Sequence, residues 1–156
     1  MPLHVERALW LGIRVHVHTL DDDVRIAGRK LPCFDEPPLH IHAREDETWY
    51  VLEGTILFQR GMERIVRGPG EAILLPRGIP HGFAVRTPQA RIVHFYTPAG
   101  VEAAFRSLSL PMDQPPPPVD PSAIEAVFGK WGVTFVGPPL PVLLAGHAAG
   151  TLQGNR

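Results

Sequence analysis

The sequence has a single cysteine, Cys33, among 156 residues. One cysteine cannot form an intramolecular disulfide, so the chain does not belong to the small secreted domains that disulfides stabilise. We interpret Cys33 as a small buried residue. Residues 1–7 contain no long apolar segment, so we expect no signal peptide. A reducing, cytoplasmic location fits these absences best.

Charge is scarce and balanced. Charged residues make up 20% of the chain, and the formal net charge is -1. Both signs are scattered, which leaves no basic face for a nucleic-acid backbone and no polybasic patch for a membrane surface. No stretch approaches the roughly 20 apolar residues of a membrane-spanning helix. We therefore expect a soluble protein whose partners include neither nucleic acid nor membrane.

Proline and glycine are abundant, at 18 and 15 residues. They separate short apolar segments at intervals of about eight to twelve residues, which is typical of a β-sandwich or barrel. The length suits one domain with one core. The predicted strands cover residues 12–19, 24–28, 30–34, 40–42, 48–53, 55–60, 63–67, 72–75, 82–86 and 91–96.

After residue 97 the apolar spacing becomes helical. A short helix is predicted with Thr97 as its cap, Pro98 in its first turn and an apolar face of Val101, Ala104, Phe105 and Leu108. A polyproline connector is predicted at residues 115–118. A second helix follows Asp120 and Pro121, ends at Gly132 and has the apolar set Ile124, Val127, Phe128 and Trp131.

Two regions are therefore predicted. Residues 1–110 form a β-barrel, and residues 111–156 form a proline-rich connector, a short helix and a C-terminal arm that packs on the barrel or on a dimer partner. The tail beyond Val136 is expected to be a loose arm, disordered from about residue 150.

The most informative feature is a group of metal-ligand residue types in the middle of the chain: His40, His42, Glu47 and His81. His40 and His42 share one face of a strand because side chains alternate. Glu47 lies an odd number of residues from both, so on a continuous strand its side chain would point to the opposite face. It can join them only if residues 43–46 form a turn. Imidazole and carboxylate together suit a divalent Fe, Mn, Ni, Co, Cu or Zn ion. Four protein ligands leave positions open on a six-coordinate ion, as in catalytic or binding sites.

A simpler interpretation exists for His40 and His42, but Glu47 and His81 at matching spacings argue against it. An isolated His-x-His pair is more often a pair of ordinary strand histidines, and His16 and His18 have the same spacing without a downstream acid or Gly-Pro turn. We interpret His16 and His18 as ordinary strand residues without a role in the site. The alternative is that they lie near the metal and contact its ligands. Glu45 and Asp46 could compete with Glu47, but a solvated turn is the expected position for both.

The spacing of these residues resembles the two conserved motifs of the cupin superfamily over residues 12–97. The first motif is matched by His40, His42, Glu47 and Gly54, with Phe34 in place of its opening glycine. The second is matched by Gly70, Pro76, Gly78 and His81, with Val85 in place of its final asparagine. The resemblance implies an all-β fold, the double-stranded β-helix or jelly-roll barrel, with short C-terminal helices. It also implies ligand roles for the same three histidines and Glu47.

Beyond the barrel, the chain has Thr97-Pro98-Ala99-Gly100 before a helix, then Asp120-Pro121, Trp131-Gly132 and Gly137-Pro138-Pro139. In this it resembles small single-domain cupins that are labelled quercetin-dioxygenase-like. That resemblance implies that Glu47 acts as the base that takes a proton from a substrate hydroxyl. It also implies a homodimer, which would protect sheet edges. The implied activity is that of a dioxygenase on a small hydroxylated or enolisable organic substrate.

Three further residues are predicted to line the substrate pocket. Trp49 shares a strand face with Glu47, and Phe83 is the next candidate. His94 either faces the barrel interior or packs under the C-terminal helices. Two other functions remain open: a sensor that binds a small molecule without converting it, and a metal-dependent sugar isomerase or epimerase. An empty, vestigial pocket is a third, which the intact ligand set argues against.

Overall fold

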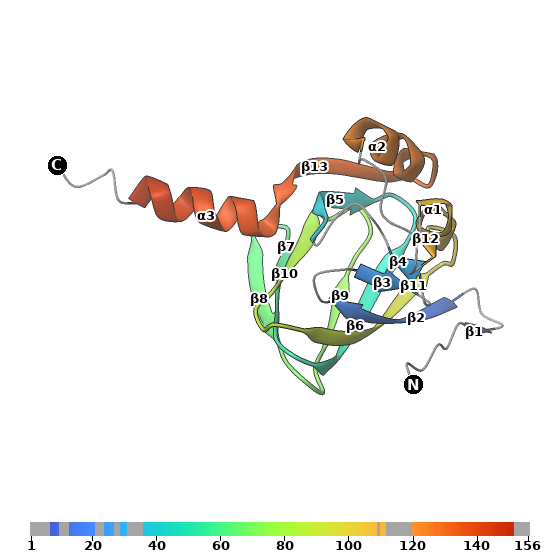
Figure 1. The fold of residues 1–156 in the computed structure, drawn as a ribbon, viewed down its shortest axis with the longest axis horizontal. Helices are drawn as coiled ribbons and strands as arrows, with labels where there is room; N and C mark the ends of the chain where they lie inside the picture. Colours follow the sequence, from blue (N-terminus) through green and yellow to red (C-terminus); the bar gives the residue numbers. More distant parts are fainter. Residues whose placement is uncertain are drawn as a thin grey trace.

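Two antiparallel sheets face each other in the computed structural model of this protein (Figure 1). The structure describes residues 7–9, 13–20, 24–26, 29–30, 36–108, 110–111 and 120–151, with side chains for 36–108 and 120–145. Some predicted features lie wholly or mostly outside the described residues: the expected strand of residues 30–34, Cys33, Phe34 and the polyproline segment 115–118.

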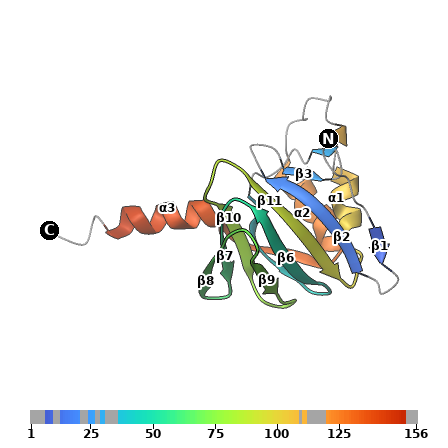
Figure 2. The same ribbon diagram turned by 90° about the horizontal axis from the view of Figure 1, so that it is seen from below.

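The larger sheet has the strand order β12-β4-β3-β2-β11-β6-β9, with β1 paired to β2. Figure 2 shows β2, β11 and β6 side by side in this sheet. Its strands are β1 (Arg7–Leu9), β2 (Ile13–Leu20), β3 (Val24–Ile26), β4 (Arg29–Lys30), β6 (Asp46–Glu53), β9 (Ala72–Leu75), β11 (Ala90–Thr97) and β12 (Leu110–Pro111).

The smaller sheet has the order β13-β5-β10-β7-β8. Consecutive strands such as β5 and β6 lie in different sheets, so the chain crosses repeatedly between the two layers. The predicted all-β jelly roll with a few short helices is confirmed. The strands of this sheet are β5 (Pro38–His42), β7 (Ile56–Arg60), β8 (Glu63–Arg67), β10 (His81–Val85) and β13 (Val133–Pro139).

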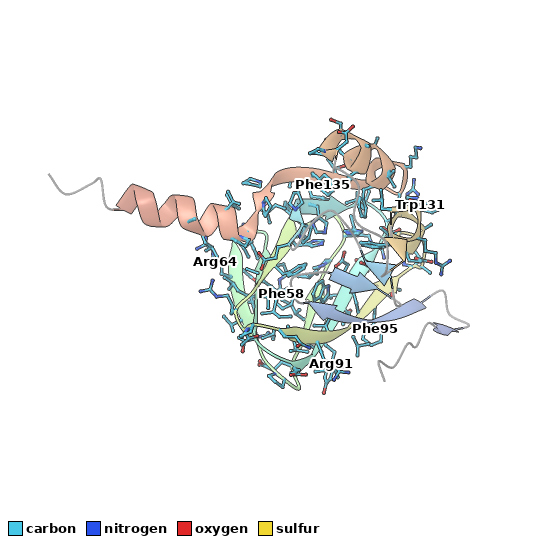
Figure 3. All side chains as sticks on the ribbon, viewed as in Figure 1. Phe58, Arg64, Arg91, Phe95, Trp131 and Phe135 are labelled. Carbon is cyan, nitrogen blue, oxygen red and sulfur yellow. The ribbon has the colours of Figure 1, made fainter. Side chains whose placement is uncertain are left out.

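Alternation along the strands sets which side chains enter the barrel. In β6 the residues Glu47, Trp49 and Val51 are buried, whereas Tyr50 and Leu52 are exposed. The same period of two places the inner residues of β11 and β9 in the core. Phe58 lies among them, between the sheets (Figure 3). The core cluster consists of Trp49, Val51, Ile56, Phe58, Ile73, Leu75, Phe83, Ala90 and Ile92.

Two helices cover one end of the barrel, α1 (Glu102–Leu108) and α2 (Pro121–Lys130). The predicted second helix is confirmed, and Asp120 caps it by accepting a hydrogen bond from the Ser122 N–H at 2.9 Å. Ile124 and Phe128 are buried against Val101, Ala104, Val133 and Tyr96. This second cluster therefore attaches the helices to the barrel.

The predicted start of the first helix is wrong. Thr97 is the last residue of β11, where it pairs with Asp46, and α1 begins five residues later at Glu102. Thr97 continues the ladder to β6 and lies too far before Glu102 for its side chain to accept a hydrogen bond from the first turn of α1. Glu102 instead accepts a hydrogen bond from the Gly100 N–H at 2.6 Å.

The C-terminal tail is also not the loose arm that the sequence predicts. Residues 133–139 form β13, which pairs with β5 and is interrupted by register shifts around Gly137 and Pro139. Hydrogen bonds to the edge of β5 outweigh the turn signals of glycine and proline in this segment. Helix α3 (Leu140–Thr151) then extends away from the barrel (Figures 1 and 2). The division into regions at residue 110 stays a prediction.

Across the described residues, no helix combines the length and apolarity needed to span a membrane.

Two motif glycines provide a matched test of backbone fit. Gly54 and Gly70 both have positive φ, +80° and +86°. A methyl group at Gly54 would overlap the carbonyl oxygen of Gln89 and lie 2.9 Å from Ala90 Cα, whereas one at Gly70 would meet nothing within 4 Å. We expect Gly70→Ala to lower the free energy of unfolding by about 1 to 2 kcal/mol and Gly54→Ala by about 3 to 5 kcal/mol.

Urea unfolding of both variants measures the difference. If both variants lose the same free energy of unfolding, the positive φ alone explains the glycine at position 54, and the close approach to residues 89–90 does not contribute.

Candidate metal centre

The structure brings together His40, His42, Glu47 and His81, whose potential ligand atoms all lie within 4.8 Å of one another. His40 and His42 come from β5 and His81 from β10, so the imidazoles belong to the smaller sheet. His81 pairs directly with His40 in the ladder between these strands. Glu47 comes from β6 in the larger sheet. The cluster thus lies between the two layers, and all four side chains are buried.

The turn between β5 and β6 makes this meeting possible. The chain bends at Ala43 and Arg44, and Ala43 N–H donates to the carbonyl of Gly132 at 2.9 Å. His42 C=O accepts from Gly78 N–H at 2.8 Å. These two hydrogen bonds connect the turn to the neighbouring segments. Because the chain turns here, Glu47 faces His40 and His42, as the sequence predicts.

Each imidazole is oriented by a bond to its Nδ1 atom. His40 Nδ1 donates to the carbonyl of Pro38, and His81 Nδ1 donates to that of Ile79, both at 2.8 Å. A carbonyl only accepts, so the Nε2 lone pair of both rings is left for another partner. His42 Nδ1 lies 3.4 Å from Glu45 Oε2. Such Nδ1 contacts are the usual support of metal-binding histidines.

The distances within the cluster fit a bound ion. His42 Nε2 lies 2.6 Å and His81 Nε2 3.6 Å from Glu47 Oε1. His81 Nε2 is fully buried and has no hydrogen-bond partner among the described residues. With metal–ligand bonds of about 2.1 Å, ligand atoms lie about 3 Å apart when adjacent and about 4 Å when opposite. The residues present therefore fit a mononuclear metal, and the orphaned nitrogen gains a partner when one is bound.

Residues 32–97 match the cupin domain family. These residues make up less than half of the chain, and the chain has the mostly β cupin fold of two antiparallel sheets. A comparison with curated proteins gave no match. The narrower resemblance to quercetin-dioxygenase-like proteins stays a prediction.

The solved structures with a similar fold include the following three. A protein of Thermus thermophilus is 21% identical over 62% of this chain and 82% of its own, with a TM-score of 0.47. A cupin-2 domain containing protein of Shewanella frigidimarina is 20% identical over 61% and 82%, with a TM-score of 0.45. A sugar phosphate isomerase of the cupin superfamily from Silicibacter pomeroyi is 20% identical over 55% and 50%, with a TM-score of 0.43. Similarities of this size say nothing about the substrate of this protein.

The electrostatics of the candidate metal site centre on Glu47. Burial opposes its ionisation, but His42 and His94 outweigh this and hold the pKa of the carboxyl well below its usual range. Burial also opposes the charged form of His42, yet Glu47 and Glu45 raise its pKa to about 9. Burial and then His81 lower the pKa of His40 to about 3. Without metal, the site therefore holds an anionic carboxylate, a protonated His42 and a neutral His40, and metal binding must displace the His42 proton.

Two of the three predicted pocket residues contact the same carboxylate, and the third packs against one of them. Trp49 Nε1–H donates to Glu47 Oε2 at 3.0 Å, and His94 Nε2 lies 3.0 Å from the same oxygen. The Phe83 ring lies 4.8 Å from that of Trp49, centroid to centroid. His94 thus faces the interior, which was one of its two predicted positions. That these residues touch a substrate stays a prediction.

Glu45 is the residue that sequence reasoning placed wrongly. Its side chain is 2% exposed rather than solvated, and it contacts His42. The signal that could have found it is the alternation of Glu45, Glu47, Trp49 and Val51, which continues the buried face of β6 backward into the turn. Asp46 has the opposite parity and pairs with Arg77 at the surface, 2.8 Å between Oδ2 and the guanidinium.

Tyr96 is a further residue of the site, beyond those that the sequence predicts. Its ring is buried 4.1 Å from His94 and 6.1 Å from His42. Burial, followed by the charges of Glu47 and Glu45, raises the pKa of its hydroxyl well above the usual range. Alternation along β11 from His94 could have found it. The predicted second pair, His16 and His18, lies in β2, for which side chains are not described.

These shifts predict the pH dependence of the metal-free protein. Between the unfolded pKa of 6.5 and about 9, folded His42 keeps a proton that the unfolded chain releases, so the free energy of unfolding falls as pH rises. Between pH 6.5 and about pH 3, His40 is protonated in the unfolded chain but not in the folded state, so the free energy of unfolding falls as pH drops. Below the usual 4.5, the lowered pKa of Glu47 adds to this loss.

We therefore expect maximal stability near pH 6.5, measured by urea unfolding in the presence of a chelator. The variant His42→Asn should lose the alkaline decline and keep the acidic one. A wild-type stability that stays constant on the alkaline side, from pH 6.5 to about 9, would contradict the assigned charges.

Proposed function

We propose that this protein binds one divalent transition metal, of the Fe, Mn, Ni, Co, Cu or Zn kind, through His40, His42, Glu47 and His81. We further propose that it is a dioxygenase-type oxidoreductase acting on a small hydroxylated or enolisable organic substrate. The observation that carries the metal site is the convergence of these four buried side chains with both imidazole Nδ1 atoms of His40 and His81 already bonded to carbonyls. The fold is compatible with many chemistries, so the oxidative activity rests on the resemblance.

The bound metal would supply a Lewis acid for the substrate oxygen. The chain supplies the remaining functions. Glu47 is anionic at neutral pH because His42 and His94 stabilise its charge, and we assign to its Oε1 the proton taken from the substrate hydroxyl. Trp49 is buried and bonded to this carboxylate, Phe83 is buried against Trp49, and both would exclude water from the reacting groups.

Metal content tests the first part of the proposal. We expect close to one metal ion per chain after mild purification or reloading, measured by elemental analysis. The variant His42→Ala should lose loading, because it removes one of the four proposed ligands, whose Nε2 lies 2.6 Å from Glu47 Oε1. Unfolding of the metal-free variant controls for loss of the fold. Wild-type protein that stays without metal after reloading would remove the proposal.

Oxygen uptake tests the second part. We expect uptake with at least one of the Fe, Mn, Ni or Co forms when flavonols, diketones and catechols are supplied, and loss of uptake in Glu47→Gln. Binding of a substrate without uptake in any form would indicate a sensor instead. Conversion of sugars without oxygen would indicate an isomerase or epimerase.

We also propose a homodimer that takes no nucleic acid or membrane partner, in the cytoplasm. Support for the dimer comes from the outward face of β6 and β9, where Tyr50, Leu52 and Leu74 are each 39 to 49% exposed, and from the position of β9 at the end of its sheet. Light scattering at micromolar concentration distinguishes the dimer from a monomer.

A further inference from the structure

The two oxygens of the Glu47 carboxylate face different groups. Oε1 points to the imidazoles, at 2.6 Å from His42 Nε2 and 3.6 Å from His81 Nε2. Oε2 points the other way, to Trp49 Nε1 and His94 Nε2, each at 3.0 Å. An oxygen that accepts two hydrogen bonds has both of its lone-pair directions occupied. The carboxylate is thus divided between a side that faces the metal ligands and a side that is held by the protein.

Both donors on the Oε2 side are fixed by packing. Trp49 is 5% exposed, and its ring contacts those of Phe58, Phe83 and His94 at centroid distances of 5.3, 4.8 and 4.6 Å. His94 is 4% exposed and lies directly opposite Trp49 in the ladder between β11 and β6. Neither ring can turn away without disturbing the core.

The direction of the bonds is also defined. An indole N–H only donates, so Trp49 holds Oε2 as an acceptor at every pH. A carboxylate acceptor selects the tautomer of His94 in which Nε2 carries the proton. Two N–H donors on a buried anion form charge-assisted hydrogen bonds, which are stronger than neutral ones.

We propose that Trp49 and His94 are positioning residues that hold Glu47 through Oε2, so that only Oε1 is available to the metal and the carboxylate binds with one oxygen. This inference rests on the proposed metal site and deepens it. A carboxylate that binds with one oxygen occupies one coordination position instead of two, which leaves more of the ion open to a substrate. Trp49 and His94, which are predicted to line the substrate pocket, therefore also hold the metal-binding residue Glu47 in place.

The hydrogen bond itself is tested in the metal-free protein. The chain has three tryptophans, and Trp49→Phe identifies the indole N–H signal of Trp49 in a proton–nitrogen NMR spectrum. We expect that signal to lie downfield and to exchange slowly with solvent, and to move upfield in Glu47→Ala. An indole signal that does not respond to Glu47→Ala would overturn the inference, whether or not the protein binds metal.

Metal affinity, measured by competition with a chelator, tests the positioning role. Loss of such a supporting contact typically weakens metal binding by about 10- to 100-fold, and we expect this for Trp49→Phe and for His94→Leu. His94→Gln, whose amide can place an N–H near the position of Nε2, should recover most of the affinity. Phe58→Leu is the matched control, because it disturbs the same aromatic cluster without removing a donor, and its affinity should stay within about threefold of the wild type.

A double-mutant cycle separates positioning from general destabilisation. In a Glu47→Ala background, Trp49→Phe should cause no further loss of affinity, since the carboxylate it holds is gone. X-ray absorption or infrared spectra of the loaded Trp49→Phe variant should show a larger share of two-oxygen carboxylate binding. Equal losses for Trp49→Phe and Phe58→Leu, or the same loss with and without Glu47, would refute the positioning role. A wild type that binds no metal would instead refute the proposed function.

Discussion

The negative charge of Glu47, buried between two sheets, is the constraint on which the site depends. An ionised carboxylate taken out of water is strongly destabilising unless donors or positive charges surround it. Here the smaller sheet supplies His42 to Oε1, and the larger sheet supplies Trp49 and His94 to Oε2. The full set of three partners is therefore assembled only when both layers are packed against each other. Folding of the barrel and assembly of the site are for this reason a single process.

The groups of the site are mounted on strands rather than on free loops. Residues on paired strands are held by ladder hydrogen bonds, which gives them a more precise geometry than loop residues have. His81 and His40 are neighbours because β10 pairs with β5. The Asp46–Arg77 ion pair also links the start of β6 to the turn before β10. This pair is exposed, so its contribution to stability is small.

Much of this arrangement could be predicted from the sequence. Period-two alternation and proline-glycine turns located most of the strands, and the spacing of His40, His42, Glu47 and His81 predicted that they meet. The two errors in secondary structure share one physical cause. Thr97 continues a strand because β6 pairs with it, and residues 133–139 form a strand because the edge of β5 accepts them. Local signals for a cap or a loose arm cannot register a hydrogen-bonding partner that is distant in the chain.

The sequence by itself determined the residue types at the site and the strand faces that carry them, because both follow from local chemistry and from alternation. It did not determine which groups hold the second oxygen of Glu47. His94 is 47 positions away along the chain, and only the register between β6 and β11 places it opposite Trp49. Burial of Glu45, by contrast, follows the alternation of the buried face of β6 and could be predicted from the sequence. Hydrogen-bond partners from separate strands are a property of the tertiary structure, since register brings them together and local propensity does not.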